Sequence, residues 1–253
     1  MSEHVRIERR DGVLAITLAR PERRNAITVA MYSALADALE SGSGDGAPRM
    51  ITISGEGQDF AAGNDLADFL EAGQRGTGDQ PVLRMLRALV NCEVPIVAAV
   101  HGNCVGIGTT MLLHCDFVIA DADTRFSLPF VDLALVPEAA STLLLPRLAG
   151  HRRAARYLML GEPFGAQEAL EIGLASHLAS SGELDAVLSS LTAALLSKPP
   201  EALRQTRELL RHGTREELLD RIDLESRAFA KRLESPEVAA AITAFFKRRA
   251  GQT

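Results

Sequence analysis

Two glycine-containing stretches of the sequence decide the fold: Phe60-Ala61-Ala62-Gly63-Asn64-Asp65-Leu66 and His101-Gly102-Asn103-Cys104-Val105-Gly106-Ile107-Gly108. Each follows an apolar, strand-like run and leads toward a predicted helix. Glycine adopts the sharp turns that such junctions need. Two turns of this kind can direct backbone N–H groups at one point, as proteins do around a carbonyl oxygen that becomes negative during a reaction. The sequence therefore predicts a site whose donors are backbone amides.

The composition argues against several classes of function. The chain has 253 residues, 47% of them hydrophobic, and a net charge of −6, which disfavours binding to nucleic acid or to an anionic membrane. The polar start Met1–Arg6 predicts no signal peptide, and no apolar run approaches the roughly 20 residues of a membrane span. The three cysteines, Cys92, Cys104 and Cys115, lack metal-ligand spacing. We expect a reduced, cytoplasmic protein without a metal site.

The N-terminal part predicts alternating strands and helices. Val5–Arg9 and Val13–Leu18 alternate apolar and polar residues around Asp11-Gly12, the pattern of a β-hairpin. Thr28 is a suitable N-cap for a helix that ends at Glu40. Further strands or helices are expected at Met50–Ile53, Val82–Val90, Pro95–Val100, Gly108–His114 and Phe117–Ala120. The polar, glycine-rich segment Gly73–Gln80 is predicted to be a mobile loop.

The pattern from Leu143 onward predicts only helices. Pro199 and Pro200 suit the start of one helix, Gly213 its end, and Ser235-Pro236 the start of the last helix. No G-x-G-x-x-G fingerprint supports a dinucleotide fold. We expect a core over residues 1–198 and a helical region for oligomerisation over residues 199–253.

Three segments, in order, resemble the crotonase (enoyl-CoA hydratase/isomerase) superfamily. Phe60–Leu66 is similar to its FxAGxDL segment, Val97–Asp116 to AxVxGxxxGxGxxxxxxCD, and Arg20–Ala26 to RPxxxNA. The resemblance extends from about Val13 to the C-terminus. It implies an α/β (ClpP/crotonase-like) spiral of ββα turns, with C-terminal helices that assemble a homotrimer or a dimer of trimers.

The resemblance also implies an acyl-CoA thioester as substrate, with no cofactor other than the coenzyme A that the substrate carries. It places the two oxyanion-hole N–H groups on Ala62 and Ile107, although the family usually has Gly where Ile107 stands. The residues expected to line the substrate and CoA site are Arg20, Arg23, Arg24, Ala26, Ala62, Asn64, Asp65, Leu66, Gly106, Thr110, Phe130 and Asp132.

The acid/base residues depart from the hydratase pattern. Enoyl-CoA hydratases use two Glu side chains to hold and activate a water, and the matching positions here are Thr110 and Phe130. Neither side chain takes up a proton from water at neutral pH. The ordinary hydration mechanism is therefore not favoured by this sequence.

One carboxylate stands where another branch of the superfamily has its base. Phe130–Ser141 resembles the PFxxLGLxPExxSS stretch of the branch that contains the peroxisomal-type Δ3,Δ2-enoyl-CoA isomerases, whose catalytic Glu matches Glu138. A single base can take a proton from C2 and return one to C4, which shifts a 3-enoyl-CoA to a 2-enoyl-CoA. Burial would raise the pKa of Glu138 and a helix N-terminus would lower it.

Three alternatives stay open at this point. One is hydration or another thioester reaction of fatty-acid degradation through Glu138 or Asp132, and another is acyl-CoA binding without turnover. The third is a thiol hydrolase, since Gly102–Gly106 has the shape of a nucleophile elbow with Cys104 at its centre. Turnover of 2-enoyl- and 3-enoyl-CoA thioesters separates the first two, and inactivation by iodoacetamide tests the third.

Overall fold

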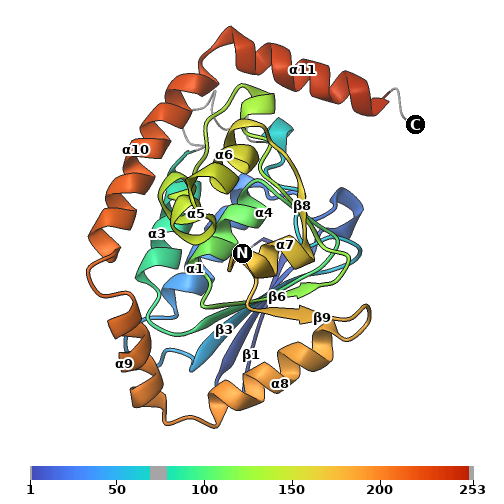
Figure 1. Ribbon diagram of the computed structural model, residues 1–253. Helices are drawn as coiled ribbons and strands as arrows, with labels where there is room; N and C mark the ends of the chain where they lie inside the picture. Colours follow the sequence, from blue (N-terminus) through green and yellow to red (C-terminus); the bar gives the residue numbers. More distant parts are fainter. Residues whose placement is uncertain (1, 69–78, 251–253) are drawn as a thin grey trace.

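A six-stranded sheet forms the centre of the computed structural model, which describes residues 2–68 and 79–250 (Figure 1). Its strands lie in the order β1 (Val5–Arg10), β2 (Val13–Leu18), β3 (Met50–Gly55), β4 (Ile96–Val100), β6 (Phe117–Asp121) and β9 (His177–Ala179). β1 and β2 are antiparallel, and each later strand is parallel to its neighbour. The predicted hairpin is confirmed: Asp11 and Gly12 have φ values of 52° and 83°, which suits a tight turn.

A smaller sheet contains β5 (Asn103–Val105), β7 (Arg125–Ser127) and β8 (Phe164–Gly165), with β7 in the middle. The prediction that the chain is only helical after Leu143 is wrong, because β8 and β9 lie in that part. Both strands are too short to show a periodicity of two, and their partners β7 and β6 lie far away in the sequence.

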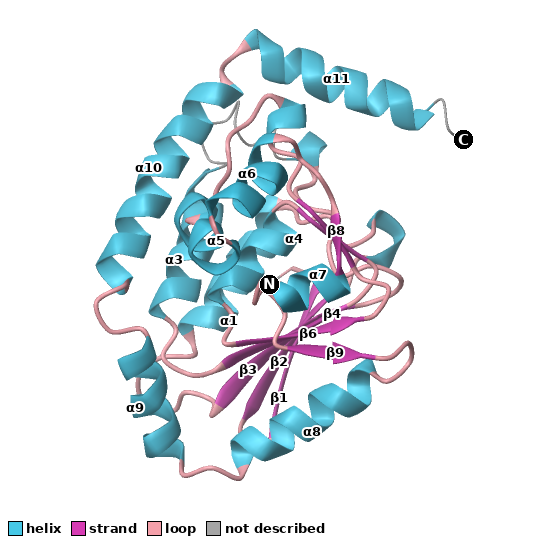
Figure 2. Cartoon of the chain, in the orientation of Figure 1, coloured by secondary structure: helices cyan, strands magenta, loops and turns pink. Residues whose placement is uncertain are grey.

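Helices cover both faces of the main sheet (Figure 2). α1 (Val29–Glu40) and α3 (Asp79–Asn91) lie over one face, and α8 (Leu184–Leu196) lies on the other. β4 is buried throughout because its alternate residues enter two cores: Ile96, Ala98 and Val100 the main core, and Val97 the smaller core against α8. This burial on both faces explains the continuous apolar run of β4.

The predicted helix starts are confirmed in part. The Met31 N–H donates to Thr28 Oγ1 at 3.2 Å, so Thr28 caps α1. The predicted loop Gly73–Gln80 falls outside the described residues over positions 73–78, while Asp79 and Gln80 already belong to α3. The short helices of the middle region are η1 (Pro21–Arg23), α4 (Ile107–Thr110), η2 (Met111–His114), η3 (Val131–Leu133), α5 (Ser141–Ala149), α6 (His151–Met159) and α7 (Ala166–Glu171).

The C-terminal part is helical, with α9 (Pro200–Leu210), α10 (Arg215–Leu233) and α11 (Pro236–Ala250). α10 runs along one side of the molecule, and α11 leads from its end toward the C-terminus (Figure 1). Leu218, Ile222 and Phe229 of α10 are buried in the main core. In residues 2–68 and 79–250, no helix combines the length and the apolar character that crossing a bilayer requires.

Candidate functional site

The two glycine-containing stretches lie side by side. The Ala61 N–H donates to the Asn103 carbonyl at 3.1 Å, and the Val105 N–H donates to the Ala61 carbonyl at 2.9 Å. Gly63 has a φ of +88°, and a Cβ there would lie 3.1 Å from the Val105 carbonyl oxygen. A Cβ on Gly108 would lie 2.9 Å from the Ala61 Cβ. The glycines therefore allow the two backbones to approach closely.

One free amide lies at the start of α4. The N–H of Ile107, the first residue of that helix, has no acceptor within the described parts of the chain. Gly106 precedes it with φ 54° and ψ −118°, a conformation suited to glycine. The Ile107 side chain is buried in the main core.

The second free amide is not the one that the sequence predicted. The Ala62 N–H donates to the Arg24 carbonyl at 2.9 Å, so this amide is not available to a ligand. The residues around Asn64 are also engaged, since Ile27 N–H donates to the Gly63 carbonyl at 2.8 Å and Asp65 N–H to the Ile27 carbonyl at 2.9 Å. The Asn64 N–H itself finds no acceptor among the residues that the structure describes. In this stretch the available donor is thus Asn64 rather than Ala62.

Glu138 is a buried carboxyl group beside α4. Its residue is only 7% exposed, and the Thr110 hydroxyl donates to Glu138 Oε1 at 3.5 Å. Burial, together with the charge of Glu225, raises the pKa of Glu138 to about 8, against the opposing effect of the Thr110 hydrogen bond. Burial is the largest of these effects on the pKa, and a group that titrates near neutral pH is suited to proton transfer.

Tyr32 and Thr110 lie between the carboxyl group of Glu138 and the residues that carry the free amides. Tyr32, a fully buried residue of α1, donates its hydroxyl hydrogen to Asn64 Oδ1. Burial, and after it the charge of Glu138, raises the pKa of Tyr32. Thr110 makes a second connection, because it lies on α4 with Ile107 and contacts Glu138. The candidate base and both free amides thus belong to one site.

The turn that carries Glu138 is held by two residues from other elements. Ala139 and Ala140 have φ values of 60° and 56°, which are unfavourable for alanine. His114 Nε2 lies 2.8 Å from the Ala139 carbonyl and must donate, since a carbonyl only accepts. Burial lowers the pKa of His114 to about 4, so the imidazole is neutral.

Glu225 of α10 is the second support of this turn. Its carboxylate accepts hydrogen bonds from the Ala140 N–H at 2.6 Å, the Thr142 N–H at 3.0 Å and the Thr142 hydroxyl. The carboxylate thereby satisfies N–H groups at the start of α5. Neither His114 nor Glu225 carries a local sequence signal, because both act through the backbone of a turn that is distant in the sequence.

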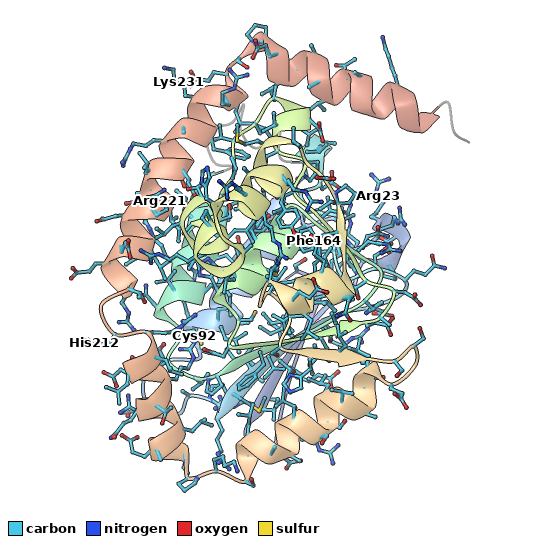
Figure 3. The ribbon with its side chains drawn as sticks, in the orientation of Figure 1. Arg23, Cys92, Phe164, His212, Arg221 and Lys231 are labelled. Atoms are coloured by element: carbon cyan, nitrogen blue, oxygen red, sulfur yellow. The ribbon has the colours of Figure 1, made fainter. Side chains whose placement is uncertain are left out.

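The arginine cluster divides between bracing and exposed residues. Arg20 donates to Asp65 Oδ2 at 2.7 Å and to the Ala26 carbonyl at 3.0 Å, so it braces the loop. Arg24 pairs with Asp59 at 2.6 Å but is half exposed, and Arg23 lies exposed at the edge of the molecule (Figure 3).

Asp65 braces its own loop, as expected for Asp in a turn. Its Oδ1 accepts from the Ala67 N–H at 3.2 Å and the Asp68 N–H at 3.3 Å. Burial acts to raise the pKa of Asp65, but the hydrogen bonds, led by that from Arg20, lower it below its ordinary value. Asp65 is therefore an ionised structural carboxylate and not a proton acceptor.

The other predicted residues occupy different environments. Thr110 and Phe130 are buried, Leu66 packs against the main core, and Asp132 is exposed in η3. Cys104 is fully buried, and burial raises the pKa of its thiol well above the ordinary value, which argues against a nucleophile. The described residues contain no group of three or more His, Cys, Asp or Glu side chains that could hold a metal ion.

Comparison with known proteins identifies the family of the chain. Residues 8–252 match the family model described as enoyl-CoA hydratase/isomerase. The chain is 31% identical to the mouse peroxisomal enoyl-CoA delta isomerase 3 over 255 residues, which cover 98% of this chain and 80% of the relative. It is 32% identical to the enoyl-CoA hydratase ACTT3 of Alternaria alternata over 243 residues, with 94% and 82% covered.

A solved structure gives the same result for the fold. The enoyl-CoA hydratase/isomerase from Pseudoalteromonas atlantica T6c superposes with a TM-score of 0.91 and 37% sequence identity, over 97% of this chain and 98% of that chain. The fold is therefore the crotonase fold that the sequence predicted. Because the family model spans nearly the whole sequence, the chain belongs to the enoyl-CoA hydratase/isomerase family of the crotonase superfamily.

Proposed function

We propose that this protein moves the double bond of a 3-enoyl-CoA to the 2-position, with Glu138 as the only base. The observation that carries the proposal is the burial of Glu138 beside Thr110, with its pKa raised to about 8. A carboxyl group of this pKa can accept and return a proton near neutral pH.

The proposed reaction needs one base and two amide donors. The Glu138 carboxylate removes a proton from C2, and the electrons of the C2–H bond move toward the thioester carbonyl to form a dienolate. The N–H groups of Asn64 and Ile107 hold the negative oxygen. The Glu138 carboxyl group then gives the proton to C4, which leaves the double bond between C2 and C3.

Hydration is the less favoured reaction because it requires a group to hold and activate water. Thr110 and Phe130 stand at the positions that resemble the two hydratase glutamates, and both are buried. Asp132 is exposed in η3, and Glu225 is engaged by the amides of Ala140 and Thr142. Neither carboxylate is therefore placed as a second acid beside Glu138.

The substrate is proposed to be an acyl-CoA thioester whose phosphates contact exposed arginines. Arg23 and Arg24 are exposed near the Asn64 segment, to which the Arg24 carbonyl is linked through Ala62. Guanidinium groups suit phosphate oxygens. Arg20 is left out of this proposal because Asp65 and the Ala26 carbonyl occupy its guanidinium group.

The decisive experiment measures isomerisation and hydration in parallel on a panel of 2-enoyl- and 3-enoyl-CoA thioesters. We expect conversion of 3-enoyl-CoA to be much faster than hydration of 2-enoyl-CoA, and to be lost in Glu138→Gln. If hydration is the faster reaction, the protein is a hydratase and the isomerase proposal is wrong. If both substrates bind and neither is converted, the protein binds acyl-CoA without catalysing a reaction.

A further inference from the structure

A cavity of about 290 Å³ lies between the end of α3, α9 and the start of α10, away from Glu138. Cys92 and His212 line it, and Figure 3 shows them on the opposite side of the molecule from Arg23. Asp116, which contacts its arginines, precedes β6 and accepts from the N–H of Ile96 at the start of β4. The cavity therefore lies at the amino ends of the parallel strands. The free amides of Asn64 and Ile107 instead follow the carboxyl ends of β3 and β5.

A buried guanidinium group, that of Arg207, and a partly buried one, that of Arg211, line the cavity and share one carboxylate. Arg207 Nε lies 2.7 Å from Asp116 Oδ2, and Arg211 Nε lies 3.9 Å from Asp116 Oδ1. Asp116 Oδ2 also accepts the Ile96 N–H at 2.8 Å. One carboxylate therefore offsets two cations, and the Arg207 side chain is only 6% exposed.

The hydrogen-bond groups of these arginines are incompletely satisfied. Arg207 Nη1 donates to the Cys92 carbonyl, and Arg211 Nη2 donates to the His114 carbonyl at 2.6 Å. Arg207 Nη2 and Arg211 Nη1 are buried and have no acceptor in the part of the chain that the structure describes. Burial, followed by the like charge of Arg207, lowers the pKa of Arg211. Buried N–H donors without an acceptor are costly, and two cations here share one carboxylate, so a further anion nearby would stabilise this arrangement.

The rest of the cavity lining carries side chains of both charges. Arg204, His212 and Arg215 line the cavity with Glu93 and Glu208. Arg204 already pairs with Glu201 at 2.8 Å and with Glu208 at 3.5 Å. Positive charge in excess of the paired carboxylates is thus found at Arg211, which shares Asp116 with Arg207, and at Arg215.

We infer that this cavity binds a small inorganic oxyanion of the phosphate or sulfate class, held by Arg211 and Arg215 above the buried Arg207. Guanidinium groups donate pairs of parallel hydrogen bonds to tetrahedral oxyanions. The bound anion would join α9 and α10 to the amino end of β6, and thereby stabilise the C-terminal helices on the core. This inference does not depend on the reaction at Glu138.

The test is titration of the purified protein with inorganic phosphate by isothermal calorimetry, at constant pH and ionic strength. We expect saturable binding of one phosphate per chain and a rise in the melting temperature that an equal ionic strength of sodium chloride does not reproduce. Arg211→Gln and Arg215→Gln should each weaken phosphate binding about tenfold or more, the effect of losing a charge-assisted hydrogen bond. Arg215 is exposed, so its substitution leaves the core intact.

Two controls identify the site. Arg227→Gln, an exposed position farther along α10 that does not line the cavity, should leave phosphate binding unchanged. Arg23→Gln should also leave it unchanged. The inference is overturned if phosphate gives no heat beyond that of chloride, if Arg211→Gln and Arg215→Gln bind phosphate as tightly as the natural sequence does, or if Arg23→Gln alone abolishes binding.

Discussion

The carboxylate of Glu225 accepts a hydrogen bond from the backbone N–H of Ala140 at 2.6 Å, two residues after Glu138. This contact joins α10, a helix of the C-terminal region, to the turn that carries the proposed base. Glu225 affects Glu138 in two ways, because it holds the turn and because its charge raises the pKa of Glu138. The C-terminal helices therefore contribute to the site as well as to the cover of the core.

Replacing Glu138 by Gln should abolish most of the proposed isomerase activity. The amide is close in size to the carboxyl group but cannot accept the C2 proton, so we expect kcat to fall about 10²–10⁴-fold with little change in KM. Steady-state kinetics with 3-enoyl-CoA, supported by circular dichroism, measures this. Asp132→Asn is the matched control and should cost much less, because Asp132 is exposed in η3. Full activity of Glu138→Gln would place the base elsewhere.

The isomerase rate should rise with pH through about 8 as Glu138 loses its proton, because only the carboxylate accepts a proton from C2. Besides burial, the groups that act on this titration are Glu225 and Thr110, and the nearby His114 is neutral at these pH values. The pH dependence of kcat/KM measures the pKa of the free enzyme. A rate independent of pH between 6 and 9 would contradict this assignment.

Substituting Glu225 by Gln should move that pH profile to lower pH. Removal of the negative charge lowers the pKa of Glu138, so activity should persist into more acidic solution. The variant should also lose stability, by about 1–3 kcal/mol, since amide N–H groups of Ala140 and Thr142 lose a charged acceptor. A loss of stability with an unchanged pH profile would mean that Glu225 acts only on the structure of the turn.

The stability of the protein should depend on pH through the same carboxyl group. The pKa of Glu138 is about 8 in the folded state and has the ordinary value of 4.5 when unfolded. Its contribution to the free energy of unfolding is therefore fully present below pH 4.5 and is lost as pH rises through 8, by at most about 1.4 kcal/mol per pH unit. Urea unfolding between pH 5 and 9 should show stability falling relative to Glu138→Gln, and parallel curves would disprove the shift.

Gly63→Ala should impair both stability and turnover. The positive φ disfavours alanine by about 1–2 kcal/mol, and the new Cβ would lie 3.1 Å from the Val105 carbonyl, which pushes apart the stretches that hold Asn64 and Ile107. Thermal unfolding and kcat measure the two effects. Gly44→Ala has a similar φ of +77° with nothing within 4 Å, so it should lose stability but keep its kcat. Equal kcat in both variants would contradict the predicted geometry.

The sequence by itself determined the features that depend on local chemistry. Asp11-Gly12 adopts the positive φ values of a tight hairpin, and Thr28 caps α1, because neither needs a distant partner. The resemblance of the two glycine-containing stretches identified the fold, since glycine is required where their backbones approach. The resemblance also placed a donor on Ile107, which begins α4 and whose N–H has no acceptor among the described residues.

Only the tertiary structure decided which groups are free and how they titrate. The acceptor that occupies the Ala62 N–H belongs to Arg24, and the carboxylate that occupies Arg20 belongs to Asp65, so neither engagement can be read from the local sequence. β8 and β9 exist because of pairing with distant strands. The pKa of Glu138 is set by burial and by Glu225 on another helix. Hydrogen-bond competition and desolvation depend on groups that folding brings together, and these effects select Asn64 over Ala62 and make Glu138 a group that titrates near neutral pH.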